Sequence, residues 1–251
     1  MPNEYDSYTV PIVVAIIEGG SDKKYLKQPL EAYFRDKYGK TCKLIPVTDL
    51  TSNPDIKDED FIKTLIGGVE TKLRSKENMV DEDVAVMISE VVHIFDIDEA
   101  YIDEDHIYID SDHPSFFYTR EGIRHISKNP VIQRNERKQR RIEELLSMST
   151  INLFGMDFPY SVYFYSVNID DFHYDDALNW DEETKNKKAA EFERQYLTKN
   201  SYKGKVKMFL KLFEKNNPSD FPTTHNDTWN YIKCDNNSLK KCSNVFLIIK
   251  Q

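Results

Sequence analysis

A buried strand at residues 10 to 17, VPIVVAII, restricts the fold of this chain more strongly than any other segment. Its β-branched residues are apolar on both faces, which is typical of a central strand in a parallel sheet covered on both sides. Further strand patterns alternate with helical ones along the chain. The alternation predicts an α/β fold with a largely parallel central sheet flanked by helices.

The other predicted elements follow from hydrophobic periodicity and from turn residues. Ser21 is the expected N-cap of the first helix, and Pro29 predicts a kink or a break inside it. Residues 104 to 130 and 216 to 240 are polar and predicted to be mostly irregular. The last segment, 244 to 249, is expected to be a strand or a buried end. The remaining expectations are strands at 42–47, 84–95 and 160–168 and helices at 21–38, 59–77, 133–149 and 181–214.

The composition indicates a folded protein, because 39% of the residues are hydrophobic and 31% are charged. The longest apolar run is far short of the roughly 20 residues of a membrane span. The first ten residues lack the pattern of a secretory signal. Three cysteines, Cys42, Cys234 and Cys242, are scattered without metal-site spacing. We therefore expect a cytoplasmic protein that is not membrane-bound and has neither a disulfide framework nor a zinc site.

Acidic residues follow the two most apolar strands, where ligands bind in an open parallel sheet. Glu18 ends the first strand and precedes Gly19 and Gly20, whereas Asp96 and Asp98 follow the second strand. Carboxylates that converge repel each other unless a cation lies among them, and oxygen ligands favour Mg²⁺ or Mn²⁺. The glycines would let a phosphate approach the backbone. The pattern therefore predicts a divalent-metal site, although strand-end acids can also simply face water.

The motifs EGGSD and DIDEA, each after an apolar strand, resemble those of the TOPRIM domain of topoisomerases, DnaG-type primases and OLD-family nucleases. The resemblance covers roughly residues 10 to 170. It implies that Glu18, Asp96 and Asp98 are catalytic and hold one or two divalent metals for phosphodiester chemistry. Asp22 matches the aspartate of the nuclease branch, and would orient the turn or bind a second metal.

The chain departs from that pattern in three places. At the widest, 80 residues separate Glu18 from Asp98, which suggests an insertion between the strands. Tyr101 replaces a glycine that often follows the second motif, and the third strand ends without an obvious catalytic lysine. We expect a TOPRIM-like catalytic domain over residues 1–175, with a helical and loop elaboration over residues 176–251 packed on it.

The segment YFYSVNIDDFHYDD is similar to small standalone TOPRIM-like proteins of prokaryotic anti-phage systems. That similarity implies a toxic effector of antiviral defence that acts with an ABC-type or AAA ATPase partner. A homodimer is compatible with the sequence. Within this segment Asn168 and His173 are further candidates for a role near the site, although a lone histidine is more often packed or exposed.

The basic tract RNERKQRR is the strongest candidate for contact with the phosphates of a nucleic acid. Its cations are expected to spread around the helix instead of lining one stripe, and a solvated helix paired with Glu143 and Glu144 is an equal alternative. A net charge of −9 argues against a general nucleic-acid coat protein and for control by a partner. The candidate contacts are Arg134, Arg137, Lys138, Arg140 and Arg141.

Together these features predict a metal-dependent nuclease that hydrolyses phosphodiester bonds of DNA or RNA, with tRNA among the candidate substrates. Two other functions stay open. One is a non-catalytic TOPRIM-like module that senses a nucleotide or binds a partner. The other is a nucleotidyl transferase, for which no basic nucleotide-binding motif is present.

Overall fold

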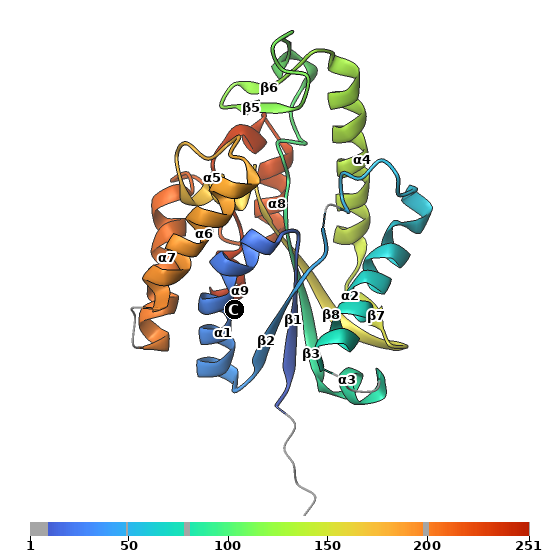
Figure 1. Cartoon of the computed structure of the whole chain (residues 1–251), viewed down its shortest axis with the longest axis vertical. Coiled ribbons are helices and arrows are strands. Elements are labelled where there is room, and N and C mark those ends of the chain that lie inside the picture. The colour runs from blue at the N-terminus through green and yellow to red at the C-terminus, as the bar shows by residue number, and fades with distance from the viewer. Residues whose placement is uncertain (1–9, 49, 78–80, 198–200, 251) are drawn as a thin grey trace, which may run out of the picture.

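The computed structural model describes residues 10–48, 50–77, 81–197 and 201–250. At its centre is a five-stranded sheet in the order β2-β1-β3-β8-β7 (Figure 1). The first four strands are parallel to their neighbours and β7 is antiparallel to β8, so the predicted α/β class with a largely parallel sheet is confirmed. The strands are β1 Ile12–Ile17, β2 Thr41–Pro46, β3 Ile88–Asp96, β7 Thr150–Leu153 and β8 Met156–Tyr165.

Strand β1 is apolar on both faces because helices cover both sides of the sheet. All six of its residues are buried. On one face α1, Gly20–Tyr38, packs against α6, Glu182–Leu197, and α7, Tyr202–Asn216 (Figure 1). On the other face lie α2, Phe61–Glu77, and α4, Lys128–Ser147, with the short α3, Asp81–Met87, leading into β3.

The connection from β3 to β8 carries an insertion that stands above the end of the sheet (Figure 1). Predicted to be irregular, it contains a small sheet in the order β4-β6-β5, so that prediction is wrong. Gly122, at φ 143°, lies so close to His106 that a Cβ atom would meet its carbonyl oxygen at 1.9 Å. The insertion's elements are a 3₁₀ turn Glu104–His106, β4 Ile107–Ile109, β5 Phe117–Thr119 and β6 Gly122–His125, followed by α4.

Two expectations for the first helix are corrected by the structure. Helix α1 runs without interruption past Pro29, which is buried, so the predicted break is absent. Its N-cap is Gly19 and not Ser21. The burial of one face of α1 under α6 and α7 explains why the helix persists, because tertiary packing outweighs local preference.

Two expectations elsewhere are also corrected, and for the C-terminal segment the structure agrees with the second alternative, a buried end. The apolar run from residue 84 begins as α3 and becomes β3 only at Ile88. The polar stretch 216–240 includes α8, His225–Lys233, and a 3₁₀ turn Asn237–Leu239. The C-terminal segment is a buried helix, α9 Phe246–Lys250, and not a strand. The remaining elements are α5 Ile169–His173 and a 3₁₀ turn Asp58–Asp60.

The segment before α9 closes the free edge of the upper part of β8. Asn244 Oδ1 accepts a hydrogen bond of 2.8 Å from the Phe164 amide, and the Ser243 hydroxyl donates to the Phe164 carbonyl at 2.7 Å. Edge amides are thereby satisfied without another strand. In the described part of the chain no helix combines the length and apolarity needed to cross a bilayer. The three cysteines are free thiols.

Candidate metal-binding site at the ends of β1 and β3

Strands β1 and β3 are parallel neighbours whose following connections leave toward opposite edges of the sheet. Ligands bind at such a switch in strand order, beyond the carboxyl ends of the strands. Glu18 comes directly after β1, and Asp96 is the last residue of β3. Oε2 of Glu18 accepts a hydrogen bond of 3.1 Å from the Asp96 amide. The two predicted acids therefore meet at this edge.

The Glu18 carboxylate is held from both sides. Its Oε1 atom accepts a hydrogen bond of 2.9 Å from the hydroxyl of Thr51, which is buried in the loop after β2. The pKa of Glu18 is raised to about 7, chiefly by burial and also by the charge of Asp98, although the charge of Lys138 opposes the shift. Burial and the nearby negative charge of Asp98 therefore disfavour the ionised form of this carboxyl group.

Asp96 is the least compensated acid of the site. Its carboxylate has no hydrogen bond or ion pair with any described residue. Burial raises its pKa well above the usual value, and the neighbouring charges of Asp22, Glu18 and Asp98 add to the effect. This set of like charges is the electrostatic signature of a cation site.

Asp98 and Glu99 form a turn in which both residues have left-handed backbone conformations, with φ angles of 51° and 56°. Such angles are uncommon for residues other than glycine and are found at functional sites. The two amides donate to the Val167 and Ser166 carbonyls at 3.1 and 3.2 Å, which fixes the turn against the chain after β8. Oδ2 of Asp98 is bonded to Nζ of Lys138. Burial alone would raise the pKa of Asp98, but Lys138 and Arg134 outweigh burial and lower it.

Glu99 lies beneath this turn and is fully buried. Neither of its carboxylate oxygens has a hydrogen-bond partner among the described residues. Burial raises its pKa to about 8, against the attraction of Arg134 and Arg120. From the sequence alone, Glu99 could not be distinguished from the acidic residues that follow it in the loop.

Asp22 closes the turn between β1 and α1. Its Oδ2 atom accepts a hydrogen bond of 2.8 Å from the Gly19 amide, and Oδ1 accepts one of 3.3 Å from the Ser21 hydroxyl. A Cβ atom on Gly19 would meet Oδ1 of Asp22 at 3.1 Å, so the glycine leaves room for this contact. Both oxygens accept hydrogen bonds within the turn. Of the two roles expected for Asp22, orienting the turn and binding a second metal, these contacts favour the first.

Lys138 is the residue whose place in the site the sequence did not reveal. It comes from α4, has no exposed surface, and bonds Asp98. Burial would lower its pKa, but the charges of Asp98 and Glu18 raise it. The chain therefore supplies a lysine to the carboxylates from the insertion and not from the third strand. The available signal was the helical spacing of Arg134, Lys138 and Arg141, which places all three on one face.

That spacing corrects the prediction that the cations of α4 spread around the helix. Arg134, Lys138 and Arg141 form a buried face. Nη1 of Arg134 donates to the Asp98 carbonyl at 2.7 Å. These three cations are engaged inside the protein, so they do not form the exposed phosphate-binding surface that was expected.

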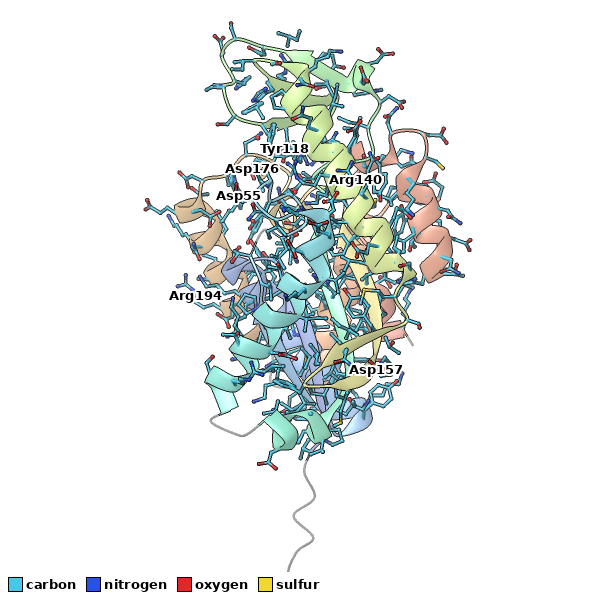
Figure 2. All side chains as sticks on the ribbon, turned by 90° about the vertical axis from the view of Figure 1, so that its right-hand side faces the viewer. Asp55, Tyr118, Arg140, Asp157, Asp176 and Arg194 are labelled. Carbon is cyan, nitrogen blue, oxygen red and sulfur yellow. The ribbon has the colours of Figure 1, made fainter. Side chains whose placement is uncertain are left out.

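The lower part of the same face clamps the loop after β2. Arg141 donates to the Leu50 and Asn53 carbonyls at 2.7 and 2.9 Å and bonds the carboxylate of Asp58 at 3.1 Å. Half-buried Arg137 donates to the Ser52 carbonyl at 3.0 Å. Arg140, labelled on α4 in Figure 2, is the exposed member of the tract and bonds Asp58 at 3.0 Å. The tract thus positions the loop that carries Thr51.

The two further candidates near β8 have structural contacts. Asn168 caps α5, with its Oδ1 atom accepting a hydrogen bond of 2.7 Å from the Asp171 amide. His173 lies between the rings of Tyr25 and Phe192, at centroid distances of 4.5 and 4.4 Å. Burial lowers the pKa of His173 to about 3, so it stays neutral at physiological pH. Neither residue points to a proton-transfer role.

The donor chemistry of this edge suits a hard divalent cation, because Glu18, Asp96 and Asp98 offer only oxygen atoms and carry more charge than Lys138 balances. As the side chains are arranged, however, no three His, Cys, Asp or Glu residues of the described ranges are grouped closely enough to hold a metal. Asp98 is turned to Lys138, and Glu18 to Thr51. Metal binding would therefore require these carboxylates to converge on Asp96.

Comparison with protein-family models, with curated proteins and with solved structures found no match to this chain.

Proposed function

We propose that this protein is a divalent-metal-dependent phosphodiesterase, specifically a nuclease, built on a TOPRIM-like domain. The observation that carries the proposal is the half-buried Asp96 carboxylate at the end of β3, which lies among the charges of Glu18, Asp98 and Asp22 and has no hydrogen-bond or ion-pair partner among the described residues. Such an arrangement is costly unless a cation is bound. The motif order EGGSD then DIDEA, each at the end of a neighbouring parallel strand, supports the TOPRIM-like assignment.

In this proposal Glu18, Asp96 and Asp98 hold Mg²⁺ or Mn²⁺. A bound divalent ion would polarise the scissile phosphate and lower the pKa of a bound water molecule. The amides at the start of α1, after Gly19, would face a phosphate oxygen, because the first turn of a helix has free donors and a positive end. Lys138 places a further positive charge where negative charge develops in the transition state.

Incubation of the purified protein with labelled RNA and DNA, with and without Mn²⁺ or Mg²⁺, tests the proposal. Asp96→Asn should lower metal-dependent cleavage by about a hundredfold or more. Asp157→Asn is the matched control, because Asp157 is an exposed acid at the opposite end of the sheet (Figure 2). Equal activity of the two variants would refute the site.

A non-catalytic module is the second candidate, and the ion pair of Lys138 with Asp98 favours it. In that function the lysine permanently balances the acids, and the protein senses a nucleotide or binds a partner. Nucleotide binding by a protein that cleaves neither RNA nor DNA with any divalent metal would identify this second function. Cleavage that requires metal and Asp96 would exclude it.

We further propose that the nuclease is the toxic effector of an anti-phage system in the cytoplasm and that an ABC-type or AAA ATPase controls it. The support is the similarity of the segment around Asn168 to small TOPRIM-like defence proteins, together with the net charge of −9. An ATPase encoded next to this chain should co-purify with it when the two are expressed together, and should alter its cleavage of nucleic acid. Independent behaviour of the two proteins would remove the partner from the proposal.

A further inference from the structure

Helix α7 carries the most concentrated unpaired positive charge in the described part of the chain. It contains five lysines and one glutamate, in a protein of net charge −9. Lys203, Lys207, Lys211 and Lys215 recur every four residues and are all exposed. None of these four forms a hydrogen bond or ion pair with a described residue, whereas Lys205, outside the row, donates to Gln28 at 2.7 Å.

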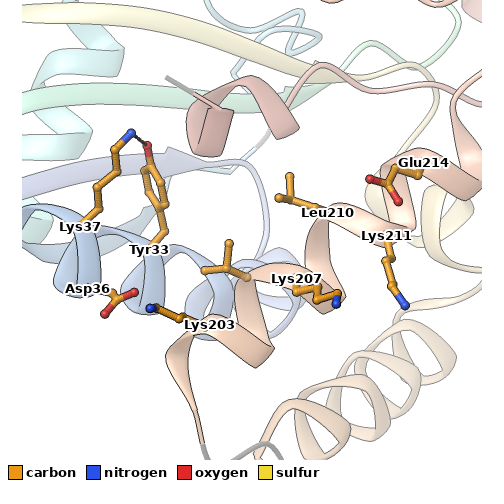
Figure 3. A pocket seen from close by; sticks show the side chains of 9 residues that line it. Tyr33, Asp36, Lys37, Lys203, Lys207, Leu210, Lys211 and Glu214 are labelled. Atoms are coloured by element: carbon orange, nitrogen blue, oxygen red, sulfur yellow. Dashed lines mark hydrogen bonds between the residues drawn. The ribbon is translucent and has the colours of Figure 1, made fainter.

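A groove of about 460 Å³ runs between α7 and the C-terminal half of α1 (Figure 3). Its floor contains Tyr33, Val206 and Leu210, and its α7 rim carries the first three lysines of the row. On the α1 side Nζ of Lys37 donates to the Tyr33 hydroxyl at 3.1 Å. Asp36 and Glu214 also line the groove, so its four lysines are opposed by two carboxylates. The groove therefore combines apolar residues with a net excess of positive charge.

The row of lysines extends toward the candidate metal site. Its four members span about 18 Å along the helix. At the end of α7, Asn216 donates to the Phe172 carbonyl of α5 at 2.7 Å. Asp170, also in α5, accepts a hydrogen bond of 2.8 Å from the Tyr25 hydroxyl of α1. Burial raises the pKa of Asp170, and the charge of Asp22 adds to this effect. The row thus ends beside the elements that border the site.

We propose that the groove between α1 and α7, with the row Lys203, Lys207, Lys211 and Lys215, binds a single-stranded segment of a nucleic acid. This inference rests on the proposed nuclease function and names how its substrate is held. Free lysines would contact successive phosphates, which supplies most of the affinity for a polyanion. The apolar floor would receive exposed bases, which a duplex keeps inside its stack.

The groove offers a positive surface in place of α4, whose cations were expected to contact phosphates but are mostly buried. An acidic nuclease needs a local positive surface to hold its substrate, and the cations Arg134, Lys138 and Arg141 are buried. The α7 row supplies that surface on the opposite face of the sheet from α4 (Figure 1). In this proposal the affinity for the nucleic acid comes from the α7 row and not from Glu18, Asp96 and Asp98.

The test is a titration of fluorescein-labelled 20-nucleotide oligouridylate with the full chain, in EDTA, followed by anisotropy at 50, 100 and 200 mM salt. The variant is the triple substitution Lys203→Glu, Lys207→Glu and Lys211→Glu. The matched control is Lys57→Glu, Lys63→Glu and Lys187→Glu, three exposed lysines outside α7 and the groove with the same change of net charge. A second variant with glutamine at the three α7 positions removes charge without reversing it, and thermal melting checks that every variant folds.

We expect the α7 triple variant to lose about a hundredfold in affinity at 100 mM salt, and the slope of log K against log salt to fall by about 2, since each single-strand phosphate contact contributes roughly 0.7. The glutamine variant should lose most of the same affinity, and the control little. Equal losses in the control, no binding by the wild type, tighter binding of a 20-base-pair duplex, or equal competition by polyglutamate would overturn the proposal. EDTA prevents cleavage, so the titration measures binding separately from nuclease activity. If binding depends on the row of lysines but the protein shows no metal-dependent cleavage, the nuclease function is refuted and the binding proposal is not.

Discussion

The ammonium group of Lys138 bonds the carboxylate of Asp98 across 40 residues of sequence, and the lysine is completely buried. Lys138 comes from the insertion, whereas Asp98 follows a strand of the central sheet. This ion pair therefore connects the insertion to the candidate site. Removal of either residue would leave the charge of the other without its partner.

Replacement of Lys138 by methionine keeps much of the side-chain length and removes the charge. We expect the variant to lose about 3 kcal/mol of unfolding free energy in the absence of metal, because Asp98 and Glu18 would remain as half-buried acids without a cation. Mg²⁺ should restore part of the loss by replacing the missing charge. Chemical denaturation with and without Mg²⁺ measures both effects, and unchanged stability of Lys138→Met would show that the pair is not a counter-ion arrangement.

Divalent metal should raise the thermal stability of the wild type. At 100 times the dissociation constant, a ligand of the folded state adds about 2.7 kcal/mol, which corresponds to roughly 5–10 °C for a chain of this size. Glu18→Gln with Asp96→Asn should abolish the gain and should itself melt no lower than the wild type without metal, since it removes repulsion. An equal metal-induced shift in the double variant, measured by scanning calorimetry, would place the metal elsewhere.

Arg141 and Arg140 are adjacent in sequence but should differ sharply in their effect on stability. Arg141 is buried and bonded to several carbonyls of the loop after β2, so Arg141→Ala should cost about 3 kcal/mol or more. Arg140→Ala removes an exposed pair with Asp58 and should cost no more than about 1 kcal/mol. Urea unfolding of the two variants compares them, and similar midpoints would contradict the buried clamp.

Acid should destabilise the protein through His93. This residue lies within β3, where its Nδ1 atom is 2.7 Å from the Tyr160 hydroxyl, and burial lowers its pKa to about 3. Between pH 6.5 and about 3 the unfolded chain binds a proton at this position that the folded chain does not. Stability should therefore fall as pH decreases through this range, by up to about 1.4 kcal/mol per pH unit.

His93→Gln removes this titration and keeps a polar partner for Tyr160. The difference in unfolding free energy between pH 7 and pH 4.5 should be smaller in the variant than in the wild type, as urea denaturation at the two pH values would reveal. A pH dependence identical to that of the wild type would show that His93 is already charged in the folded protein.

Local pattern was sufficient to place β1, β3 and β8 and to identify Glu18 and Asp96 as neighbours. Apolar runs on both faces report a buried strand wherever it occurs, and parallel strands bring their carboxyl ends to one edge. The same reasoning left α9 open between a strand and a buried end, because a short apolar segment has the same composition in a buried helix and in a strand. It missed β4, β5 and β6, whose three or four residues are too few to show a period.

Only the tertiary structure shows which cations contact the carboxylates of the candidate site. The sequence of α4 shows six basic residues, but it does not show which face of that helix is covered. Packing of the insertion buries Lys138 against Asp98, whereas Lys203, Lys207, Lys211 and Lys215 of α7 are exposed. The physical reason is that hydrophobic periodicity is local, whereas the energy of a charge depends on every charge and on the burial that distant segments bring to it.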